Sequence, residues 1–247
     1  MNKLEIFNLS KIIKKTPFSK STQKKILNNI NITFTPGINV ILGPNGAGKS
    51  TLLNMIIDST TDTKNNIIYN GAPTYLSNHD FRKELGYLPQ NQQLYDFFTV
   101  EQFAYYIASL KGINASNVPD EVQYALRCMN LNKYSKQKIS KLSGGMKQRL
   151  LIATTILGRP SVIVLDEPFV GLDPIERYHF LEILKKLSKN SIIIITTHII
   201  SDIEKIADRV IFLKNGMIIE NDSPVNLINK YSPSSDLFSA YLKCFNC

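Results

Sequence analysis

The sequence predicts an α/β protein built on a mostly parallel β-sheet. Three short segments are apolar through their centres, as expected of parallel strands buried on both faces: residues 39–42, 161–165 and 191–197. Segments of helical character separate these strands, so helices are expected to cover both faces of the sheet. With 247 residues, the chain is long enough for one large α/β domain with a subdomain.

An antiparallel hairpin is predicted near the end of this core. The run 209–214 is followed by Asn215-Gly216 and then by the apolar run 217–220. Asn-Gly between two strand-like runs is the strongest short-range signal of a tight hairpin. The sheet is therefore expected to be parallel in its centre and to end in one antiparallel pair.

The middle of the chain is predicted to be helical. Thr99 and Gln102 have the spacing of a capping box, so a helix is expected to begin there. Pro119 and Asp120 are typical of the first turn of a second helix. Both helices carry apolar residues on one side: Val100, Phe103, Ile107 and Leu110 in the first, and Val122, Ala125, Leu126 and Met129 in the second.

These elements predict a single domain, 1–247, with three parts. Residues 1–90 and 159–220 form the α/β core. Residues 91–158 form a helical subdomain, which is inserted because both of its ends return to core strands. Residues 221–247 form a mostly polar C-terminal tail that is either a partner-docking segment or a frayed end.

Composition excludes several classes of protein. No run of about 18 or more uncharged apolar residues occurs, so no membrane span is expected. The N-terminus begins with charged and polar residues around Lys3 and Glu5 rather than a secretory signal, so a cytosolic location is expected. Three cysteines give no disulfide framework, and Cys244 and Cys247 form a C-x-x-C that is interpreted as two tail residues rather than a redox or metal pair.

The net charge of +9 is concentrated near the N-terminus. Six lysines occur there in a segment without any acid: Lys11, Lys14, Lys15, Lys20, Lys24 and Lys25. A nucleic-acid patch, contact with an anionic membrane surface and a solvated basic loop all fit this pattern. Phe18 is the lone aromatic residue among these lysines, so stacking on single strands is not supported and no nucleic-acid partner is expected. A solvated loop is favoured, with membrane proximity second.

A glycine-rich loop connects the strand at 39–42 to an apolar helix. Its glycines let successive backbone N–H groups turn inward toward phosphate oxygens, and the helix N-terminus adds its positive dipole end. Lys49 can reach the β- and γ-phosphates of a nucleotide, and the Ser50 hydroxyl can ligate Mg²⁺. The residues predicted to bind nucleotide here are Gly43, Pro44, Asn45, Gly46, Ala47, Gly48, Lys49, Ser50 and Thr51.

Two carboxylates follow the buried strand at 161–165. Asp166 ends the strand, the position from which a P-loop protein holds Mg²⁺. Glu167 is the next residue and can polarise a water aligned with the γ-phosphate. Together with the glycine-rich loop, this pair predicts a magnesium site and a general base beside a bound nucleotide.

Four further motifs resemble those of ATP-binding cassette (ABC) ATPases. Leu142-Ser143-Gly144-Gly145-Met146 resembles their signature motif, and Gln90 in Tyr87-Leu88-Pro89-Gln90 is similar to their Q-loop. Gly171-Leu172-Asp173 resembles the D-loop, and His198 in Thr196-Thr197-His198 the switch histidine. Order and spacing agree from about residue 1 to 220. The resemblance implies a P-loop NTPase core, an N-terminal antiparallel β portion and an inserted helical subdomain.

The signature motif implies a second copy of the chain. Ser143 is a good N-cap for a helix over 146–157, so Ser143, Gly144 and Gly145 present a second anion-binding helix terminus. In the family this terminus contacts the γ-phosphate of ATP held by the opposite protomer, and two ATP molecules are buried across a two-fold axis. By resemblance, Met146 and Asp173 also belong to this interface, Gln90 joins Mg²⁺ or the attacking water to the subdomain, and His198 donates to the γ-phosphate.

This sequence departs from the family pattern at several positions. The aromatic residue that stacks on adenine is replaced by Ile13 in the simplest alignment, so Phe18 is nominated for that role. Met146 stands where glutamine is common, and Phe169 where a small or hydroxyl residue is common. Both positions are peripheral to the phosphates, so ATP binding is still expected.

The resemblance therefore predicts the ATP-hydrolysing subunit of an ABC transporter, most readily an exporter, with ATP and Mg²⁺ as cofactors. Because no membrane span is expected, the pore must be formed by separate permease subunits, which would hold the chain at the cytoplasmic face of the membrane. The alternative is a soluble ABC ATPase, for example of the iron–sulfur assembly type. A regulatory module that binds ATP without hydrolysis is disfavoured by the intact Asp166, Glu167 and His198.

Overall fold

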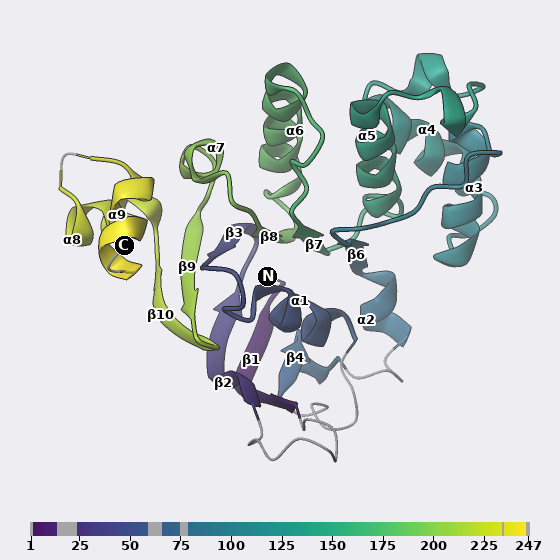
Figure 1. Ribbon diagram of the computed structural model, residues 1–247. Helices are drawn as coiled ribbons and strands as arrows, with labels where there is room; N and C mark the ends of the chain where they lie inside the picture. The colour runs from purple at the N-terminus through teal and green to yellow at the C-terminus, as the bar shows by residue number, and fades with distance from the viewer. Residues whose placement is uncertain (1, 14–23, 59–65, 75–78, 234, 246–247) are drawn as a thin grey trace, which may run out of the picture.

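The computed structural model describes residues 2–13, 24–58, 66–74, 79–233 and 235–245, and contains two β-sheets (Figure 1). The larger sheet is parallel except for one antiparallel pair at its edge, so the predicted α/β class is confirmed. Its strands, in spatial order, are β10 (Met217–Asp222), β9 (Arg209–Lys214), β3 (Gly37–Leu42), β8 (Ile192–Thr196), β7 (Val162–Asp166) and β6 (Leu85–Leu88).

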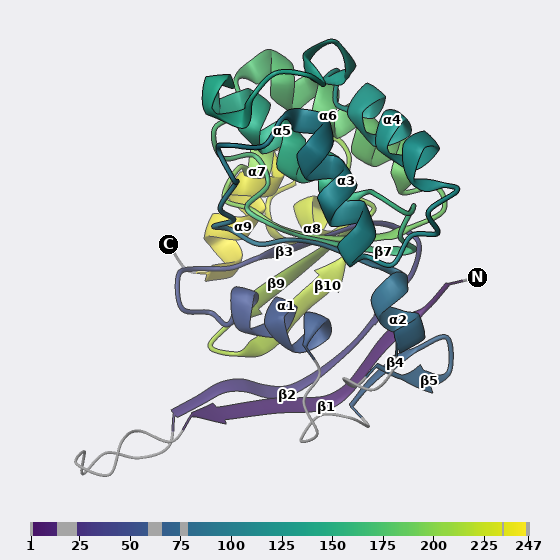
Figure 2. The ribbon, with the colours of Figure 1, turned by 90° about the vertical axis from the view of Figure 1, so that its right-hand side faces the viewer.

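The smaller sheet is antiparallel and comes from the N-terminal part of the chain, as the family resemblance implied. Its strands, in spatial order, are β2 (Lys24–Phe34), β1 (Leu4–Ile13), β4 (Ile67–Tyr69) and β5 (Ala72–Pro73). It packs below the main sheet, with helix α1 (Lys49–Ile57) between the two and α2 (His79–Lys83) near one edge (Figure 2).

The main sheet separates two hydrophobic cores. Strand β8 shows the division most clearly, because all of its residues are buried. Ile193 and Ile195 pack into the core on the helix side, whereas Ile192 and Ile194 pack into the core that contains α1 and the small sheet. A strand that is apolar on both faces is therefore what this central position requires.

The remaining helices cover the other face of the main sheet (Figures 1 and 2). They are α3 (Val100–Leu110), α4 (Val118–Cys128), α5 (Gly144–Thr155), α6 (Pro174–Leu187), α7 (Ile200–Glu204), α8 (Pro224–Tyr231) and α9 (Leu237–Phe245), with two short 3₁₀ turns at Asn132–Tyr134 and Ile139–Lys141. In the part of the chain that the structure describes, no helix is long and apolar enough to cross a membrane.

The hairpin turn at Asn215-Gly216 braces the glycine-rich loop. Both residues have positive φ, 50° and 74°, as the predicted tight turn requires. A Cβ at Gly216 would lie 2.2 Å from the carbonyl oxygen of Ile26, so this turn has no space for a side chain. The Gly216 N–H donates to the Ala47 carbonyl at 2.9 Å, and the turn thereby supports the loop before α1.

The predicted capping box at the start of α3 is confirmed, since Thr99 and Gln102 each accept the other's backbone N–H. Of the residues on the predicted apolar side, Val100 and Phe103 are buried, whereas Leu110 is 66% exposed. At about 100° of rotation per residue, Leu110 lies about 20° from the buried Phe103 around the helix axis, so it is on the predicted side, and it is exposed at the last residue of α3. In α4 the predicted apolar side is confirmed by the buried residues Val122, Ala125, Leu126 and Met129.

The C-terminal tail is folded, so a frayed end is the wrong interpretation. Helices α8 and α9 contribute Leu227, Leu237 and Phe245 to the helix-side core. The first residue of α9, Leu237, donates its N–H to Glu204 at 3.0 Å, and Lys214 donates to the carbonyl of Phe245 at the other end, at 3.2 Å. The tail is mostly polar in composition, but it carries a narrow row of apolar residues that packs into the core. Cys244 is half-buried in α9, and Cys247 lies outside the described residues.

Lys111, directly after α3, joins two helices of the middle block. Its ammonium donates to the carbonyls of Thr155 at 2.8 Å and Leu157 at 3.0 Å, at the C-terminal end of α5. Burial lowers the pKa of Lys111 from 10.5 to about 8. Because the folded chain then binds fewer protons than the unfolded chain between these values, this group makes stability rise with pH through that window.

We therefore expect Lys111→Met to remove a pH-dependent part of the stability. The free energy of unfolding of the wild type minus that of the variant should increase from about pH 8 to about pH 10, by at most about 1.4 kcal/mol per pH unit. Urea unfolding at stepped pH measures this difference. Lys185→Met, at an exposed position on α6, is the control and should show no trend. A flat difference for Lys111→Met would contradict the burial argument.

Candidate functional site

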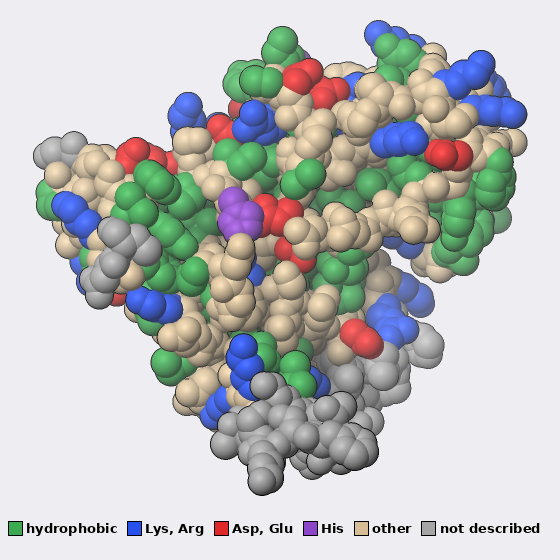
Figure 3. Space-filling model, viewed as in Figure 1, with side chains coloured by type: hydrophobic (Ala, Val, Ile, Leu, Met, Phe, Trp, Pro, Cys, Tyr) green, Lys and Arg blue, Asp and Glu red, His purple; other side chains and the backbone are tan. Residues whose placement is uncertain are grey.

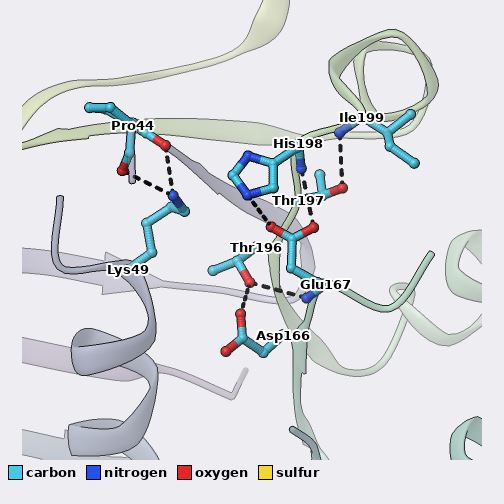
Figure 4. Close-up of polar contacts among 9 residues, drawn as sticks. Pro44, Lys49, Asp166, Glu167, Thr196, Thr197, His198 and Ile199 are labelled. Carbon is cyan, nitrogen blue, oxygen red and sulfur yellow. Dashed lines mark hydrogen bonds and ion pairs between the residues drawn. The ribbon is translucent and has the colours of Figure 1, made fainter. Parts of the chain in front are cut away.

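The glycine-rich loop lies between β3 and α1, and its backbone is shaped by positive φ angles. Gly48 is the N-cap of α1, with φ 107°. A Cβ there would lie 2.8 Å from the Leu27 side chain, so glycine is required by conformation and by space. Lys49 begins α1, and its Nζ donates to the carbonyls of Gly43 at 2.7 Å and Pro44 at 3.2 Å (Figure 4). The lysine therefore lies across the loop.

The electrostatic environment of Lys49 combines burial with attraction. Burial lowers the pKa of Lys49, and the nearby carboxylates of Glu167 and Asp166 oppose that shift. The Lys49 ammonium is half-buried, and the Gly43 and Pro44 carbonyls hold it at the cavity. It is therefore well prepared to bind an anion such as a phosphate.

A cavity of about 300 Å³ opens beside this loop. It brings together most of the predicted phosphate, metal and catalytic residues, and adds two from β2. The lining residues are Lys24, Ile26, Asn45, Gly46, Gly48, Lys49, Ser50, Thr51, Gln90, Asp166, Glu167 and His198. Figure 3 shows acidic side chains next to a histidine side chain near the centre of the molecular surface.

Lys24 and Ile26 were missed by the sequence interpretation as site residues. Both come from the antiparallel sheet, whose edge reaches the cavity only through long-range packing. The signal available in the sequence was the basic segment to which Lys24 belongs. A lysine at the rim adds a second positive charge to a cavity that also contains Lys49.

Asp166 and Glu167 are held by the neighbouring strand β8. The hydroxyl of Thr196, which is fully buried, donates to Asp166 Oδ1. The backbone N–H of Glu167 donates to the Thr196 carbonyl at 3.0 Å and approaches its hydroxyl at 3.3 Å. These bonds hold Glu167 at φ 51°, a left-handed conformation that turns its side chain out of the strand. Thr196 is thus a positioning residue. The sequence placed it in the motif of His198 but predicted no role for it.

Glu167 and His198 contact each other directly (Figure 4). The Nε2 atom of His198 lies 3.0 Å from Glu167 Oε1, and the His198 backbone N–H donates to Glu167 Oε2 at 3.3 Å. Burial raises the pKa of Glu167, while His198 and Lys49 oppose that shift. The Glu167 carboxylate is therefore oriented at both oxygens and is a better proton acceptor than an exposed glutamate.

The donor set beside the loop fits a magnesium ion. Asp166 supplies a carboxylate with Oδ2 free of the Thr196 bond, Ser50 a hydroxyl and Gln90 an amide oxygen, and all three line the same cavity. Mg²⁺ prefers such oxygen donors and usually combines one or two carboxylates with substrate phosphates. The residues present are therefore consistent with the metal predicted from the sequence.

The signature residues do not line this cavity. Ser143 caps α5 as predicted, since its hydroxyl accepts the Met146 N–H at 3.2 Å, and Gly144 is exposed beside it. The helix begins at Gly144 rather than Met146. Asp173, predicted for the same interface, is exposed and caps α6. Helices α1 and α5 lie on opposite sides of the main sheet (Figure 2), so one chain does not bring these groups together.

The adenine-stacking residue remains a prediction. Phe18 lies outside the described residues. Ile13, the residue of the simplest alignment, ends β1 and is 50% exposed.

A phosphate-binding loop between a strand and a helix, with carboxylates at the carboxyl end of a neighbouring parallel strand, defines a P-loop nucleotide-binding protein. The comparison with protein families goes further. The family described as ABC transporter matches residues 27–170, and the chain belongs to that family. The family predicted from the sequence is thereby confirmed.

Relatives and solved structures agree with this assignment. Over 191 residues the chain is 33% identical to an uncharacterized ABC transporter ATP-binding protein, YxlF, of Bacillus subtilis, covering 76% of this chain and 63% of YxlF. It is 32% identical to the Nod factor export ATP-binding protein I of Rhizobium sp. (strain N33), covering 84% of this chain and 69% of that protein. The chain thus spans about two thirds of the length of these two relatives.

A solved structure of an ATP binding subunit of an ABC transporter has the same fold, with a TM-score of 0.82 at 24% identity. That superposition covers 98% of this chain and 99% of the other. The cbiO1 protein of Clostridium perfringens, part of an ABC transporter complex, has a TM-score of 0.76 at 26% identity, covering 92% and 90%.

Proposed function

We propose that this chain is the ATP-hydrolysing subunit of an ABC transporter and that it drives export through separate membrane subunits. The observation that carries the proposal is the single cavity containing Lys49, Asp166, Glu167 and His198. The family assignment supports ATP as the nucleotide. The export-related name of one relative, the Nod factor protein, supports transport over a soluble ABC ATPase and export over import.

The roles of the loop and the metal ligands follow from the geometry of the cavity. The backbone N–H groups of Gly46 to Gly48 and the Lys49 ammonium would bind the phosphates. Ser50, Gln90 and Asp166 would hold Mg²⁺, which would neutralise part of the charge of the phosphates. Their donor atoms approach the cavity from α1, the segment after β6 and the end of β7, so a bound nucleotide would tie these elements together.

Glu167 would act as the general base and His198 as its partner. A carboxylate at the cavity wall, with a pKa raised by burial, can accept the proton of an attacking water. His198 contacts the same carboxylate and is 59% exposed, so its ring can leave Glu167 and donate to the γ-phosphate. Both groups end adjacent parallel strands and therefore share one edge of the sheet.

A second copy of the chain would complete the site. The N-terminus of α5 is uncovered at Ser143 and Gly144, and a 12-residue helix with an exposed N-terminus favours an anion. We place this terminus, with Met146 and Asp173, against ATP held by the opposite protomer. Solved ABC cassettes with this fold include one described as dimeric, with ADP and Pi bound. In this arrangement, residues 91–158 act as a subdomain that carries α5.

An aromatic surface beside α3 is the proposed contact with the membrane subunit. Tyr95, Phe97, Tyr106 and Leu110 are all exposed, between 39% and 70%. Hydrophobic side chains gather on the outer side of α3 in Figure 3. Exposed apolar surface of this kind marks an interaction site. Because the segment before α3 begins at Gln90, a partner bound here would sense the cavity through that residue.

We expect Phe97→Ser to separate the chain from the membrane without loss of ATPase activity. Phe97 is 70% exposed, so the substitution should not disturb folding. The measurement is the share of the chain that copurifies with detergent-solubilised membranes. Phe238→Ser, on α9 and 49% exposed, is the control. A wild-type chain found only in the soluble fraction would overturn the transporter proposal. If Phe97→Ser still copurifies with the membranes, the contact with the membrane subunit lies elsewhere on the chain.

A further inference from the structure

Helices α5 and α6 meet near their N-termini on the helix side of the main sheet (Figures 1 and 2). Each of these ends carries residues predicted for the interface between two copies: Ser143 to Met146 on α5, and Asp173 on α6. The proposed function requires both ends to reach the partner's nucleotide together. The contact between them is therefore a candidate for a positioning device.

Glu176, in the first turn of α6, contacts both ends at once. Its carboxylate accepts the Asp173 N–H at 3.3 Å, and its own N–H donates to Asp173 Oδ1 at 2.8 Å. These two bonds form a capping box, which fixes the Asp173 backbone. The other carboxylate oxygen lies 3.3 Å from Nε of Arg149, on α5.

The same carboxylate occupies the space beside Gly145. A Cβ at Gly145 would lie 2.1 Å from Glu176 Oε2, which is closer than any real contact. The end of a free glutamate side chain would simply move aside. Here it is held by Asp173 and Arg149, so moving it would break the capping box or the ion pair. The second glycine of the signature is therefore required by Glu176 within the same chain.

The ion pair between Glu176 and Arg149 is partly buried, and further hydrogen bonds of α5 support it. The side chains of Arg149 and Glu176 are each 20% exposed, so water screens this pair less than a surface pair. Arg149 also donates to the Met129 carbonyl at 3.1 Å, which ties the ion pair to the end of α4. The residue before Arg149, Gln148, donates to the carbonyl of Pro168 at 3.0 Å, and Pro168 directly follows Glu167.

We propose that Glu176 is a positioning residue that couples the signature end of α5 to the Asp173 loop, so that the two reach the partner's nucleotide as one surface. The proposal rests on the proposed function, because it needs the ATP-bound dimer. It adds an intrachain link between two interface elements that are separated by 27 residues in sequence, from Met146 to Asp173.

The first test is dimer formation in the Glu167→Gln background, with MgATP as the probe. Glu176→Ala should weaken ATP-dependent dimerisation about tenfold at each composite site, because it removes both the bond to the Asp173 N–H and the ion pair with Arg149. Two equal sites make this about a hundredfold in the dimer dissociation constant. Glu176→Gln keeps an oxygen for the Asp173 N–H and should lose less. MgATP binding by the monomer should stay within about twofold, since Glu176 does not line the cavity.

A control on the same helix separates a positioning role from general destabilisation. Glu182→Ala, on the same helix and paired only at the surface with Lys185, should dimerise like the parent. A parent that does not dimerise with MgATP overturns the proposed function and this role with it. If the Glu167→Gln parent dimerises with MgATP and the added Glu176→Ala substitution leaves that dimerisation unchanged, the positioning role is overturned and the proposed function stands.

The second test asks whether Gly145 and Glu176 are coupled, and it needs no activity. Gly145→Ala should lower Tm by about 2–4 °C when Glu176 is present, because the methyl group displaces the carboxylate. In the Glu176→Ala background the same change should be neutral or raise Tm, since alanine is favoured over glycine in a helix. An equal loss of Tm in both backgrounds would overturn the contact that carries the proposal.

Discussion

Replacing Glu167 with glutamine is expected to reduce steady-state ATP hydrolysis by about 10² to 10⁴-fold, the usual contribution of a general base. Glutamine has the same shape but cannot accept the proton of the attacking water. Its amide oxygen can still accept the His198 backbone N–H, which donates to Glu167 Oε2 at 3.3 Å. The fold and the phosphate loop should therefore persist, and MgATP should bind with near wild-type affinity.

The same variant should accumulate as a dimer with MgATP. If hydrolysis separates two chains that share ATP, a chain that binds without hydrolysis remains associated. Size-exclusion chromatography with MgATP, and again with MgADP, measures this difference. Glu182→Gln is the matched control, because Glu182 is half-exposed on α6, outside the cavity lining. A Glu167→Gln chain that hydrolyses ATP at the wild-type rate would show that another group is the base.

Features set by a few neighbouring residues were predicted well from the sequence. The capping box at Thr99, the N-cap at Ser143 and the Asn215-Gly216 turn each depend on hydrogen bonds or φ angles within four residues. The same holds for the loop before α1, where glycines and the following helix make a local structure. For such features the sequence pattern and the structure describe the same short-range physics.

Features set by packing between distant segments were not predicted. Leu110 continues the apolar side of α3, yet it is exposed at the last residue of the helix, because burial there depends on which distant segment covers that end. The tail folds because Leu227, Leu237 and Phe245 pack into the core, and Glu204 and Lys214, which lie outside the tail, bind the two ends of α9. Lys24 reaches the cavity only because the small sheet packs against α1.

One local signal was overlooked although it was readable. Asp173-Pro174-Ile175-Glu176 is itself a capping-box pattern, with proline at the first helical position. Interpreting Asp173 only as an interface residue hid its second role as the N-cap of α6. The partner of that box, Glu176, is also the residue that contacts Gly145 and Arg149.

Replacing Lys49 with alanine is expected to lower the affinity for MgATP strongly. Lys49 supplies the ammonium inside the phosphate loop, where the Gly43 and Pro44 carbonyls hold it at the cavity. Loss of one charge-assisted hydrogen bond weakens binding by about 10 to 150-fold, and an ammonium that reaches two phosphates would lose more than one. Calorimetric titration with MgATP measures the change.

The matched control is Lys24→Ala, because both lysines line the cavity but only Lys49 lies across the loop. Lys24 is exposed on β2 and acts through a screened charge, so its loss should weaken ATP binding by no more than about fivefold, equivalent to about 1 kcal/mol. Lys49→Arg should bind weakly as well, since a planar guanidinium cannot replace a compact ammonium held by the Gly43 and Pro44 carbonyls. Equal losses for Lys24→Ala and Lys49→Ala would mean that net charge attracts the nucleotide. A selective loss for Lys49 would mean that the geometry of the loop binds it.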